Sequence, residues 1–193
     1  MTADGPISGT QPAESEWVGQ VLKYWFEELG DAHWFEASRD VDGQIRTRFL
    51  ALHEQLVNGH ISPSASPRGM LAAIVVLDQF SRNMFRGTPR AYAADAQARQ
   101  LAKAAIAQQL DLGLSATERQ FLYLPFQHSE NREDQARSVA LYAQLGNEDW
   151  NSYALAHQAL IDEFGRFPHR NAILGRQSTE EEKTRLTQPM GSF

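Results

Sequence analysis

Apolar residues recur every three or four positions along most of this chain, which is the spacing of one face of an α-helix. The first stripe covers residues 17–29 and is followed by Gly30, a common residue just past a helix end. A second stripe covers residues 41–56, and a loop rich in serine and proline follows over 62–67. No segment shows the alternation of apolar and polar residues that marks a half-buried strand, so the pattern predicts an all-α protein.

The most apolar part of the chain is the run Met70–Leu77, which continues into Asp78 without any turn residues. A buried strand fits such a run locally, but the missing turn favours a fully buried central helix. Thr88 and Pro89 suit the cap and the first position of a further helix. The alanine-rich sequence after them predicts that this helix reaches about Leu110.

Helix ends are also marked in the second half of the chain. Ser115 and Glu118 have the spacing of a capping box, and Pro125 is expected to break the helix that they begin. Acidic residues after Thr179 suit the first turn of a last helix, because the helix dipole favours negative charge there. Between these two points, helices are predicted over about residues 131–145 and 150–164.

Together these elements predict an all-α, single-domain bundle of about seven to nine helices over residues 16–193. Residues 1–15 lack the basic and apolar parts of a signal peptide and are expected to form a disordered tail. The stretch 140–164 has the small and aromatic residues of a tetratricopeptide hairpin, in which two helices pack antiparallel. This stretch occurs once, whereas a solenoid needs about three repeats.

The composition argues against several classes of function. The chain has 193 residues, a formal net charge of −6 and a pI near 5.5. Nucleic-acid and membrane-surface binding are therefore not expected, since both need a cationic face. No apolar run approaches the roughly 20 residues of a membrane-spanning helix. The absence of cysteine excludes disulfides and thiol nucleophiles, and it suits a protein of the cytoplasm.

Three polar clusters interrupt the apolar pattern where burial is predicted. The first is LDQFSRNMFR over residues 77–86, in which Arg82 lies four residues after Asp78 on the same helix face. In one interpretation this pair is purely structural. In the other, Arg82, Asn83 and Arg86 supply hydrogen-bond donors to an anion, for which guanidinium groups are well suited.

The second cluster, His128-Ser129-Glu130, precedes the helix predicted at 131–145. A helix N-terminus tends to bind anions. His128 and Glu130 are the best candidates for acid–base chemistry, because imidazole titrates near neutral pH and a carboxylate can act beside it. In the structural alternative, Ser129 caps the helix and Arg132 pairs with a neighbouring carboxylate.

The third cluster lies between the last two predicted helices, in FGRFPHRNAILGRQ over residues 164–177. It interleaves apolar residues with the basic residues Arg166, His169, Arg170 and Arg176. An exposed loop needs few apolar residues, and a buried loop does not tolerate unpaired arginines. We therefore expect a half-buried loop whose basic side chains line a cleft, unless all of them pair with carboxylates.

His157 lies on the apolar face of the helix predicted at 150–164 and is expected to be buried. Such a histidine is commonly a hydrogen-bonded core residue, but it can also bind a ligand. With nearby carboxylates, His128, His157 and His169 can alternatively form a metal site. The chain has neither H-E-x-x-H nor E-x-x-H spacing, and it has no glycine-rich phosphate loop, so no metal or other cofactor is predicted.

The sequence contains several long and unusual motifs. The main ones are YWFEEL (24–29), LDQFSRNMFRGTPRAY (77–92), ERQFLYLPFQHSE (118–130), FGRFPHRN (164–171) and the terminal GSF. In these motifs the chain resembles the bacterial DUF924 family, and the resemblance extends from about Trp17 to Phe193. The resemblance implies a tetratricopeptide-like all-helical fold and carries no established catalytic residue. The family word resembles LDQFPRN. Here Ser81 replaces the proline, which should relax the local backbone, while Arg82 and Asn83 are kept.

Three hypotheses of function fit these observations. The first is an enzyme or binding protein whose Arg- and His-lined pocket takes a small anionic molecule with a phosphate or carboxylate group. The second is a tetratricopeptide-like module that binds a protein partner in a helical groove, and the third is a metal-dependent enzyme. For the first hypothesis the candidate catalytic residues are His128, Glu130 and His169, and the candidate ligand-binding residues are Arg82, Asn83, Arg86, His157, Arg166, Arg170 and Arg176.

Overall fold

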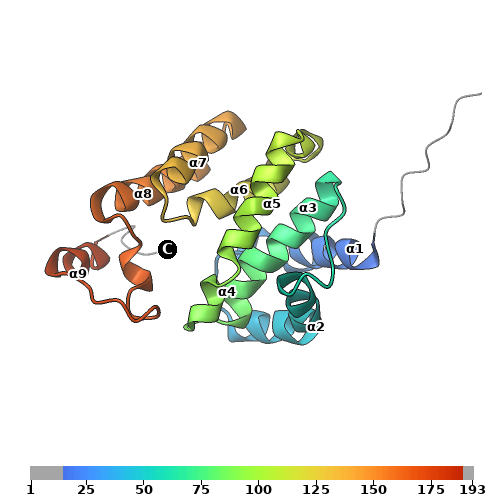
Figure 1. Ribbon diagram of the computed structural model, residues 1–193, viewed down its shortest axis with the longest axis horizontal. Coiled ribbons are helices and arrows are strands. Elements are labelled where there is room, and N and C mark those ends of the chain that lie inside the picture. Colours follow the sequence, from blue (N-terminus) through green and yellow to red (C-terminus); the bar gives the residue numbers. More distant parts are fainter. Residues whose placement is uncertain (1–14, 189–193) are drawn as a thin grey trace, which may run out of the picture.

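The computed structural model describes residues 15–188, and every regular element in this range is a helix (Figure 1). The predicted all-α class is therefore confirmed. The α-helices are α1 (Glu16–Lys23), α2 (Arg39–Val57), α3 (Pro67–Ile74), α4 (Ser81–Met84), α5 (Asp95–Ala107), α6 (Ala116–Gln127), α7 (Arg132–Leu145), α8 (Glu148–Phe164) and α9 (Glu180–Leu186). Two segments are π-helical, η1 (Tyr24–Leu29) and η3 (Val75–Phe80). Four are 3₁₀ turns, η2 (Asp31–His33), η4 (Pro89–Tyr92), η5 (Leu110–Gly113) and η6 (Pro168–Arg170).

The apolar run predicted as a central helix forms the centre of the core. α3, η3 and α4 follow one another without a break, and every side chain of residues 71–77 is 0% exposed. α3 packs against α1, α5 and α6, and η3 packs against α2. Because burial of apolar surface is the dominant favourable contribution to folding, this helix is firmly held.

Ser81 lies inside this continuous helix. Its hydroxyl donates to the carbonyl oxygen of Leu77 (2.7 Å) and lies 2.8 Å from Nε2 of His53. A proline at this position has neither a hydroxyl nor an N–H group. Serine therefore adds a polar link between the central helix and α2 that a proline cannot make.

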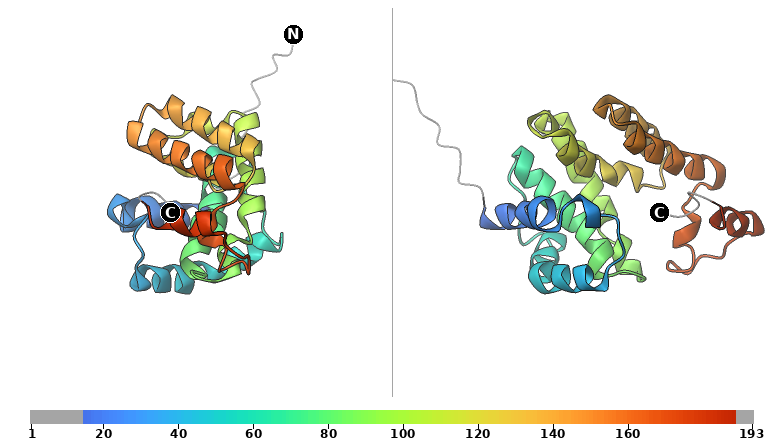
Figure 2. Two further views of the ribbon diagram at one scale, coloured as in Figure 1. Left: turned by 90° about the vertical axis from the view of Figure 1, so that its left-hand side faces the viewer. Right: turned by 180° about the vertical axis from the view of Figure 1, so that it is seen from behind.

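Antiparallel helices build the second half of the molecule. α7 packs along α8 and against α6, and Figures 1 and 2 show α7 and α8 side by side. This is the hairpin that the tetratricopeptide-like composition predicts. The segment after α8 leads to α9 at the end of the molecule away from α1 (Figures 1 and 2). Here Leu160, Ile161 and Phe167 form a small apolar cluster of their own.

Most of the predicted helix ends are confirmed. Ser115 and Thr179 each begin a helix with a capping box, as their sequence context indicates. α7 and α8 end at Gly146 and Gly165, whose φ angles of 69° and 70° lie in the left-handed region that favours glycine. These ends follow from local chemistry, which is why a single sequence predicts them.

The predicted break at Pro125 is wrong. Pro125 lies within the last turn of α6, and beyond it the N–H of His128 still donates to the carbonyl oxygen of Leu124 (2.9 Å). A proline cannot donate the hydrogen bond of its own residue, but near a helix end the loss is confined to that one bond. α6 therefore extends as far as the His128 cluster.

The predicted cap at Thr88 is also wrong, and the alternative in which Ser129 caps a helix does not hold. The hydroxyl of Thr88 donates to the carbonyl oxygen of Phe85 (2.7 Å) and caps no helix, so the expected long helix starts as η4 and becomes α-helical only at α5. At α7 the cap is Asn131, whose side chain accepts from two backbone N–H groups of the first turn. The Ser129 hydroxyl instead donates to Asp134 (2.9 Å).

No helix within residues 15–188 is both long enough and apolar enough to cross a membrane. The predicted N-terminal tail lies, up to residue 14, outside the described residues.

Candidate functional site

A cavity of about 680 Å³ is bordered by the central helix, α6, α8 and the segment after α8. This volume suits a small organic molecule. The predicted site residues that line it are Arg82, Asn83, Arg86, His128, His157, His169 and Arg170. The other three, Glu130, Arg166 and Arg176, do not line it.

The buried carboxylate of Asp78 lies next to this cavity, in the π-helical segment η3. It is 0% exposed, and it is contacted by Nη1 of Arg82 (3.2 Å), Nδ1 of His128 (2.9 and 3.0 Å) and Nε2 of Gln79 (2.6 Å). Burial by itself raises the pKa of Asp78, but Arg82 and His128 hold it well below its usual value. Asp78 is therefore ionised near neutral pH.

His128 is oriented by this carboxylate. Because ionised Asp78 only accepts hydrogen bonds, Nδ1 of His128 carries the proton and Nε2 remains an acceptor. Within residues 15–188 Nε2 has no hydrogen-bond partner, and the side chain is 15% exposed where it lines the cavity. Burial and the nearby charge of Arg82 lower the pKa of His128, so the ring is neutral near pH 7. An imidazole held in this way by a carboxylate can accept a proton.

Arg170 reaches the cavity from the η6 turn. Its side chain is 7% exposed, and its Cζ lies 4.7 Å from the ring centroid of Tyr92 and 4.5 Å from that of Phe167. Nη1 lies 3.5 Å from Asp95, but the guanidinium donates no hydrogen bond to any residue from 15 to 188, and Nε is buried without a partner. Burial, and then the charge of Arg82, lower the pKa of Arg170 to about 10, so it stays protonated at neutral pH. Such a guanidinium is suited to bind a carboxylate or a phosphate.

The other arginines of the cavity already donate to carboxylates. Arg82 donates to both oxygens of Asp95 (3.1 Å each). Arg86 donates to both oxygens of Asp42 (2.7 and 2.8 Å), and the side-chain amide of Asn83 donates to the same group (2.8 Å). The three side chains that the sequence predicts as anion donors thus already donate to carboxylates of the protein. In this they differ from Arg170.

The remaining two histidines of the cavity are neutral. Nδ1 of His157 donates to the carbonyl oxygen of Tyr153 (2.8 Å), and burial lowers the pKa of this histidine to about 3. Burial, followed by the charge of Arg170, lowers the pKa of His169 to about 4. The prediction that His157 is buried is confirmed, since it is 4% exposed. Nowhere in residues 15–188 are three or more His, Asp or Glu side chains grouped to hold a metal ion.

A family model described as "Bacterial protein of unknown function (DUF924)" matches residues 21–190. The chain belongs to the DUF924 family. It is also similar to a solved structure, a protein of unknown function from Agrobacterium tumefaciens, with 35% sequence identity and a TM-score of 0.83 over 88% of this chain and 96% of that chain. A comparison with curated proteins gives no match. The family inferred from the sequence words is therefore confirmed.

In this DUF924 protein, Glu130 fixes the loop that carries His169 and Arg170. Its carboxylate accepts from the backbone N–H of Phe167 (2.8 Å) and from both Nη atoms of Arg176 (2.7 and 2.9 Å). Arg176 also donates to the carbonyl oxygen of Phe167 (3.2 Å). Glu130 and Arg176, predicted as a catalytic and a ligand-binding residue, thus pair with each other and with the Phe167 peptide outside the cavity.

Arg166 also acts outside the cavity. Its guanidinium donates to both oxygens of Glu182 (2.6 and 2.9 Å) and to the carbonyl oxygen of Gln177 (2.9 Å). Glu182 in turn accepts from the N–H of Thr179 (2.8 Å) at the cap of α9. Arg166, predicted to bind a ligand, therefore anchors α9 to the loop.

Sequence reasoning missed two residues that organise the cavity. Asp95 contacts both Arg82 and Arg170, and Tyr92 lies against both guanidinium groups. In the sequence, Asp95 looks like an ordinary acidic residue within an alanine-rich helix, and no local signal marks its partners. The pairing of Asp78 with Arg82, by contrast, was predicted from the four-residue spacing and is confirmed.

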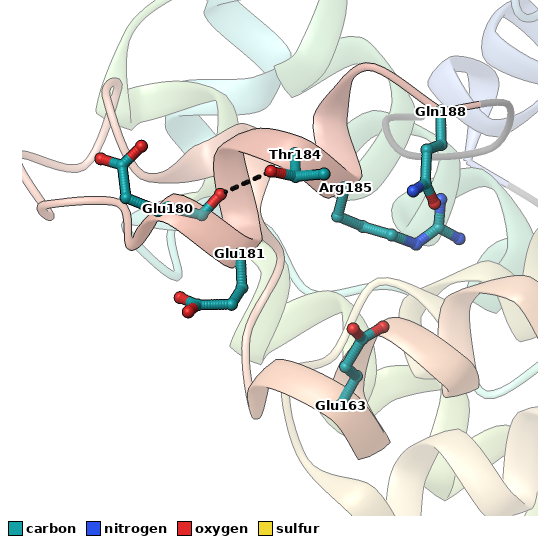
Figure 3. A pocket seen from close by; sticks show the side chains of 6 residues that line it. All are labelled: Glu163, Glu180, Glu181, Thr184, Arg185 and Gln188. Atoms are coloured by element: carbon teal, nitrogen blue, oxygen red, sulfur yellow. Dashed lines mark hydrogen bonds between the residues drawn. The ribbon is translucent and has the colours of Figure 1, made fainter.

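A second hollow, of about 690 Å³, lies on the surface between α8 and α9 (Figure 3). It is bordered by Glu163, Glu180, Glu181, Thr184, Arg185 and Gln188. The hydroxyl of Thr184 donates to the carbonyl oxygen of Glu180 (2.9 Å), a contact within α9 itself (Figure 3). None of the buried polar atoms that lack partners in residues 15–188 belongs to this hollow. The first cavity is therefore the candidate site.

Proposed function

We propose that this DUF924 protein is an enzyme that binds a small anionic substrate at Arg170 and moves a proton at Nε2 of His128. One observation carries the proposal. A single cavity is lined both by a buried guanidinium with unused hydrogen-bond donors and by a histidine oriented by a buried carboxylate. Buried charges lose their hydration, so arrangements of this kind concentrate at functional sites.

The anion is expected to bind Arg170 through two parallel N–H···O hydrogen bonds. The rings of Tyr92 and Phe167 on the guanidinium restrict its orientation. Two oxygens of a carboxylate or phosphate match the fork of donors that a guanidinium presents. Within residues 15–188, Asp95 at 3.5 Å is the only carboxylate within 4 Å of this group. A substrate can therefore bind without displacing a two-pronged salt bridge.

The proton transfer uses the pair of Asp78 and His128. A substrate O–H or acidic C–H group that meets Nε2 gives its proton to that nitrogen, and the electron pair of the broken bond stays on the substrate. The imidazolium that forms is stabilised by ionised Asp78 through Nδ1–H. When the proton returns to the product, His128 is neutral again. This is general acid–base catalysis.

Binding of inorganic phosphate and of acetate to the full-length chain tests the proposal, by calorimetric titration and by thermal unfolding. We expect saturable binding of at least one anion in the native chain and its loss in Arg170→Gln. The matched control is Arg39→Gln, which changes an exposed arginine at the start of α2. A ligand at about 100 times its dissociation constant raises the unfolding free energy by about 2.7 kcal/mol, which corresponds to roughly 5–11 °C. Binding that survives in Arg170→Gln, or no binding by the native chain, contradicts the proposal.

The two other hypotheses from the sequence are supported by no specific observation. A peptide-binding tetratricopeptide-like module uses an extended concave surface, whereas seven of the ten site residues predicted from the sequence line one cavity. We further propose that the enzyme acts in the cytoplasm on a small-molecule substrate, which the lack of cysteine suits.

A further inference from the structure

The walls of the same cavity favour a narrower class of ligand. Aromatic side chains line it from several elements, namely Trp34, Phe35, Tyr92, Tyr142, Trp150 and Tyr153. Two of these large side chains are exposed, Phe35 by 67% and Tyr153 by 49%. Exposed aromatic residues that gather at one cavity mark a surface that the apolar part of a ligand can cover.

Two buried amide oxygens of the same cavity accept no hydrogen bond from the described residues. Oε1 of Gln120 and Oε1 of Gln127 have no hydrogen-bond partner within residues 15–188, and both residues are 5% exposed. An amide oxygen only accepts, so an N–H or O–H group is needed to satisfy it. The hydroxyl of Tyr142 does not donate to Oε1 of Gln120, because its single proton is already bonded to the backbone carbonyl oxygen of Gln120 (2.9 Å).

We infer that the ligand is a small acid built on a planar ring, an inference that rests on the proposed function. Its carboxylate or phosphate binds Arg170, its ring packs against the aromatic walls, and an N–H or O–H group on it donates to the amide of Gln120 or Gln127. The cavity of about 680 Å³ has room for one such molecule. An inorganic anion satisfies only the first of these three features and should bind more weakly.

Calorimetric titration of the full-length chain with a matched series of acids tests this inference. The carboxylate probes are acetate, cyclohexylacetate, phenylacetate and the three hydroxyphenylacetate isomers. Inorganic phosphate and phenyl phosphate test the alternative acidic group, and the tighter of the two ring compounds identifies which acid the site prefers. We expect phenylacetate to bind at least about tenfold more tightly than acetate, and more tightly than the non-planar cyclohexylacetate. At least one hydroxy isomer should bind about threefold more tightly than phenylacetate.

Two substitutions assign these gains to the walls and to an amide. Phe35→Ser should weaken phenylacetate binding about threefold and leave acetate binding unchanged. Its matched control is Leu112→Ser, because Leu112 is 65% exposed and does not line the cavity. Gln120→Leu removes a buried acceptor, so it should reduce the gain from the hydroxyl group while phenylacetate affinity is kept.

Each outcome separates this inference from the proposed function. If acetate and phenylacetate bind equally, and both need Arg170, the ring inference is wrong and the anion site stands. If the hydroxyl gain survives in both Gln120→Leu and Gln127→Leu, the assignment of the donor to these amides is wrong. If the acids bind equally well to Arg170→Gln, or if none of the probes binds, the proposed function fails as well.

Discussion

The two sides of the cavity are held in place by different forces. Asp78 lies on η3, within the central helix whose residues 71–77 are 0% exposed, and His128 lies at the end of α6. His169 and Arg170 lie on the loop after α8, where Phe167 forms a small apolar cluster with Leu160 and Ile161 of α8. The proposed acid–base pair is therefore built on the hydrophobic core. The proposed anion-binding side is held by charged hydrogen bonds together with a small apolar cluster.

Two ion pairs hold this loop. Glu130 with Arg176 fixes the Phe167 peptide to the segment before α7, and Arg166 with Glu182 joins the loop to α9. Directional bonds of this kind place a loop accurately with little apolar area, but each contributes less to stability than burial of a core helix. We therefore expect that substitutions can perturb the two sides of the cavity separately.

The largest effect is expected from Arg82→Met, on the core side of the cavity. The substitution leaves Asp78 and Asp95 without the guanidinium that both contact, and Asp78 is 0% exposed. Removing one partner of a buried ion pair costs about 3–5 kcal/mol. Urea unfolding at pH 7 measures it, and a loss below about 1 kcal/mol would contradict the account of the core side.

Acidification should destabilise the chain by an amount of the order of 3 kcal/mol between pH 7 and pH 4.5. In the folded state the pKa of His157 is lowered to about 3 and that of His169 to about 4, below the ordinary value of 6.5. The folded state therefore binds fewer protons than the unfolded state below pH 6.5. Stability is full above that pH and is lost as the pH falls toward the folded values.

Urea midpoints at pH 7, 6, 5 and 4.5 check this dependence. The variant His169→Gln should make the unfolding free energy depend less steeply on pH, because it removes one of the two titrating histidines. A native chain whose unfolding free energy rises on acidification from pH 7 to pH 5 would contradict the assignment of neutral, buried histidines.

A smaller effect on stability is expected from Glu130→Gln, which weakens the attachment of the loop. The partly exposed ion pair with Arg176 is worth about 1 kcal/mol, but its loss should lower phosphate or acetate affinity about tenfold, because Arg170 is no longer held in place. Hydrogen exchange of residues 165–178 should speed up. Glu133→Gln, in the exposed first turn of α7, is the control. Unchanged anion affinity in Glu130→Gln would show that the loop needs no such attachment.

The smallest effect on stability is expected from Arg170→Met. This guanidinium is buried and makes no hydrogen bond within residues 15–188, so its removal should change the unfolding free energy by less than about 1 kcal/mol. Compared with Arg82→Met by the same urea measurement, it separates a binding arginine from a structural one. A loss above about 3 kcal/mol would make Arg170 structural too.

The fold is largely predictable because helix position depends on local rules. Apolar spacing locates the helices, and caps such as Ser115 and stops such as Gly165 mark their ends. The π-helical geometry of η3 is not predictable in this way, because its composition also fits a regular α-helix. Pro125 shows the opposite error. A proline is a strong signal for a helix break, but in this chain it is accommodated in the last turn of α6.

The site is predictable only to the level of its polar clusters. Arg166 and Arg170 are four residues apart in one loop, and nothing in their spacing shows which of them lines the cavity. Their partners decide it. Arg166 donates to Glu182 on α9, whereas Arg170 stacks against Tyr92 from a distant part of the chain. Contacts between such distant segments are set by packing, which a single sequence does not display.

If His128 and Arg170 act on one bound anion, ¹⁵N NMR of the histidine side chains should detect that anion at both residues. At pH 7 we predict that His128 is protonated at Nδ1 and unprotonated at Nε2. Its Nε2 resonance should shift when phenylacetate is added to the native chain and stay unchanged in Arg170→Gln. A proton on Nε2, or a His128 resonance that does not respond to an anion bound at Arg170, would contradict the claim.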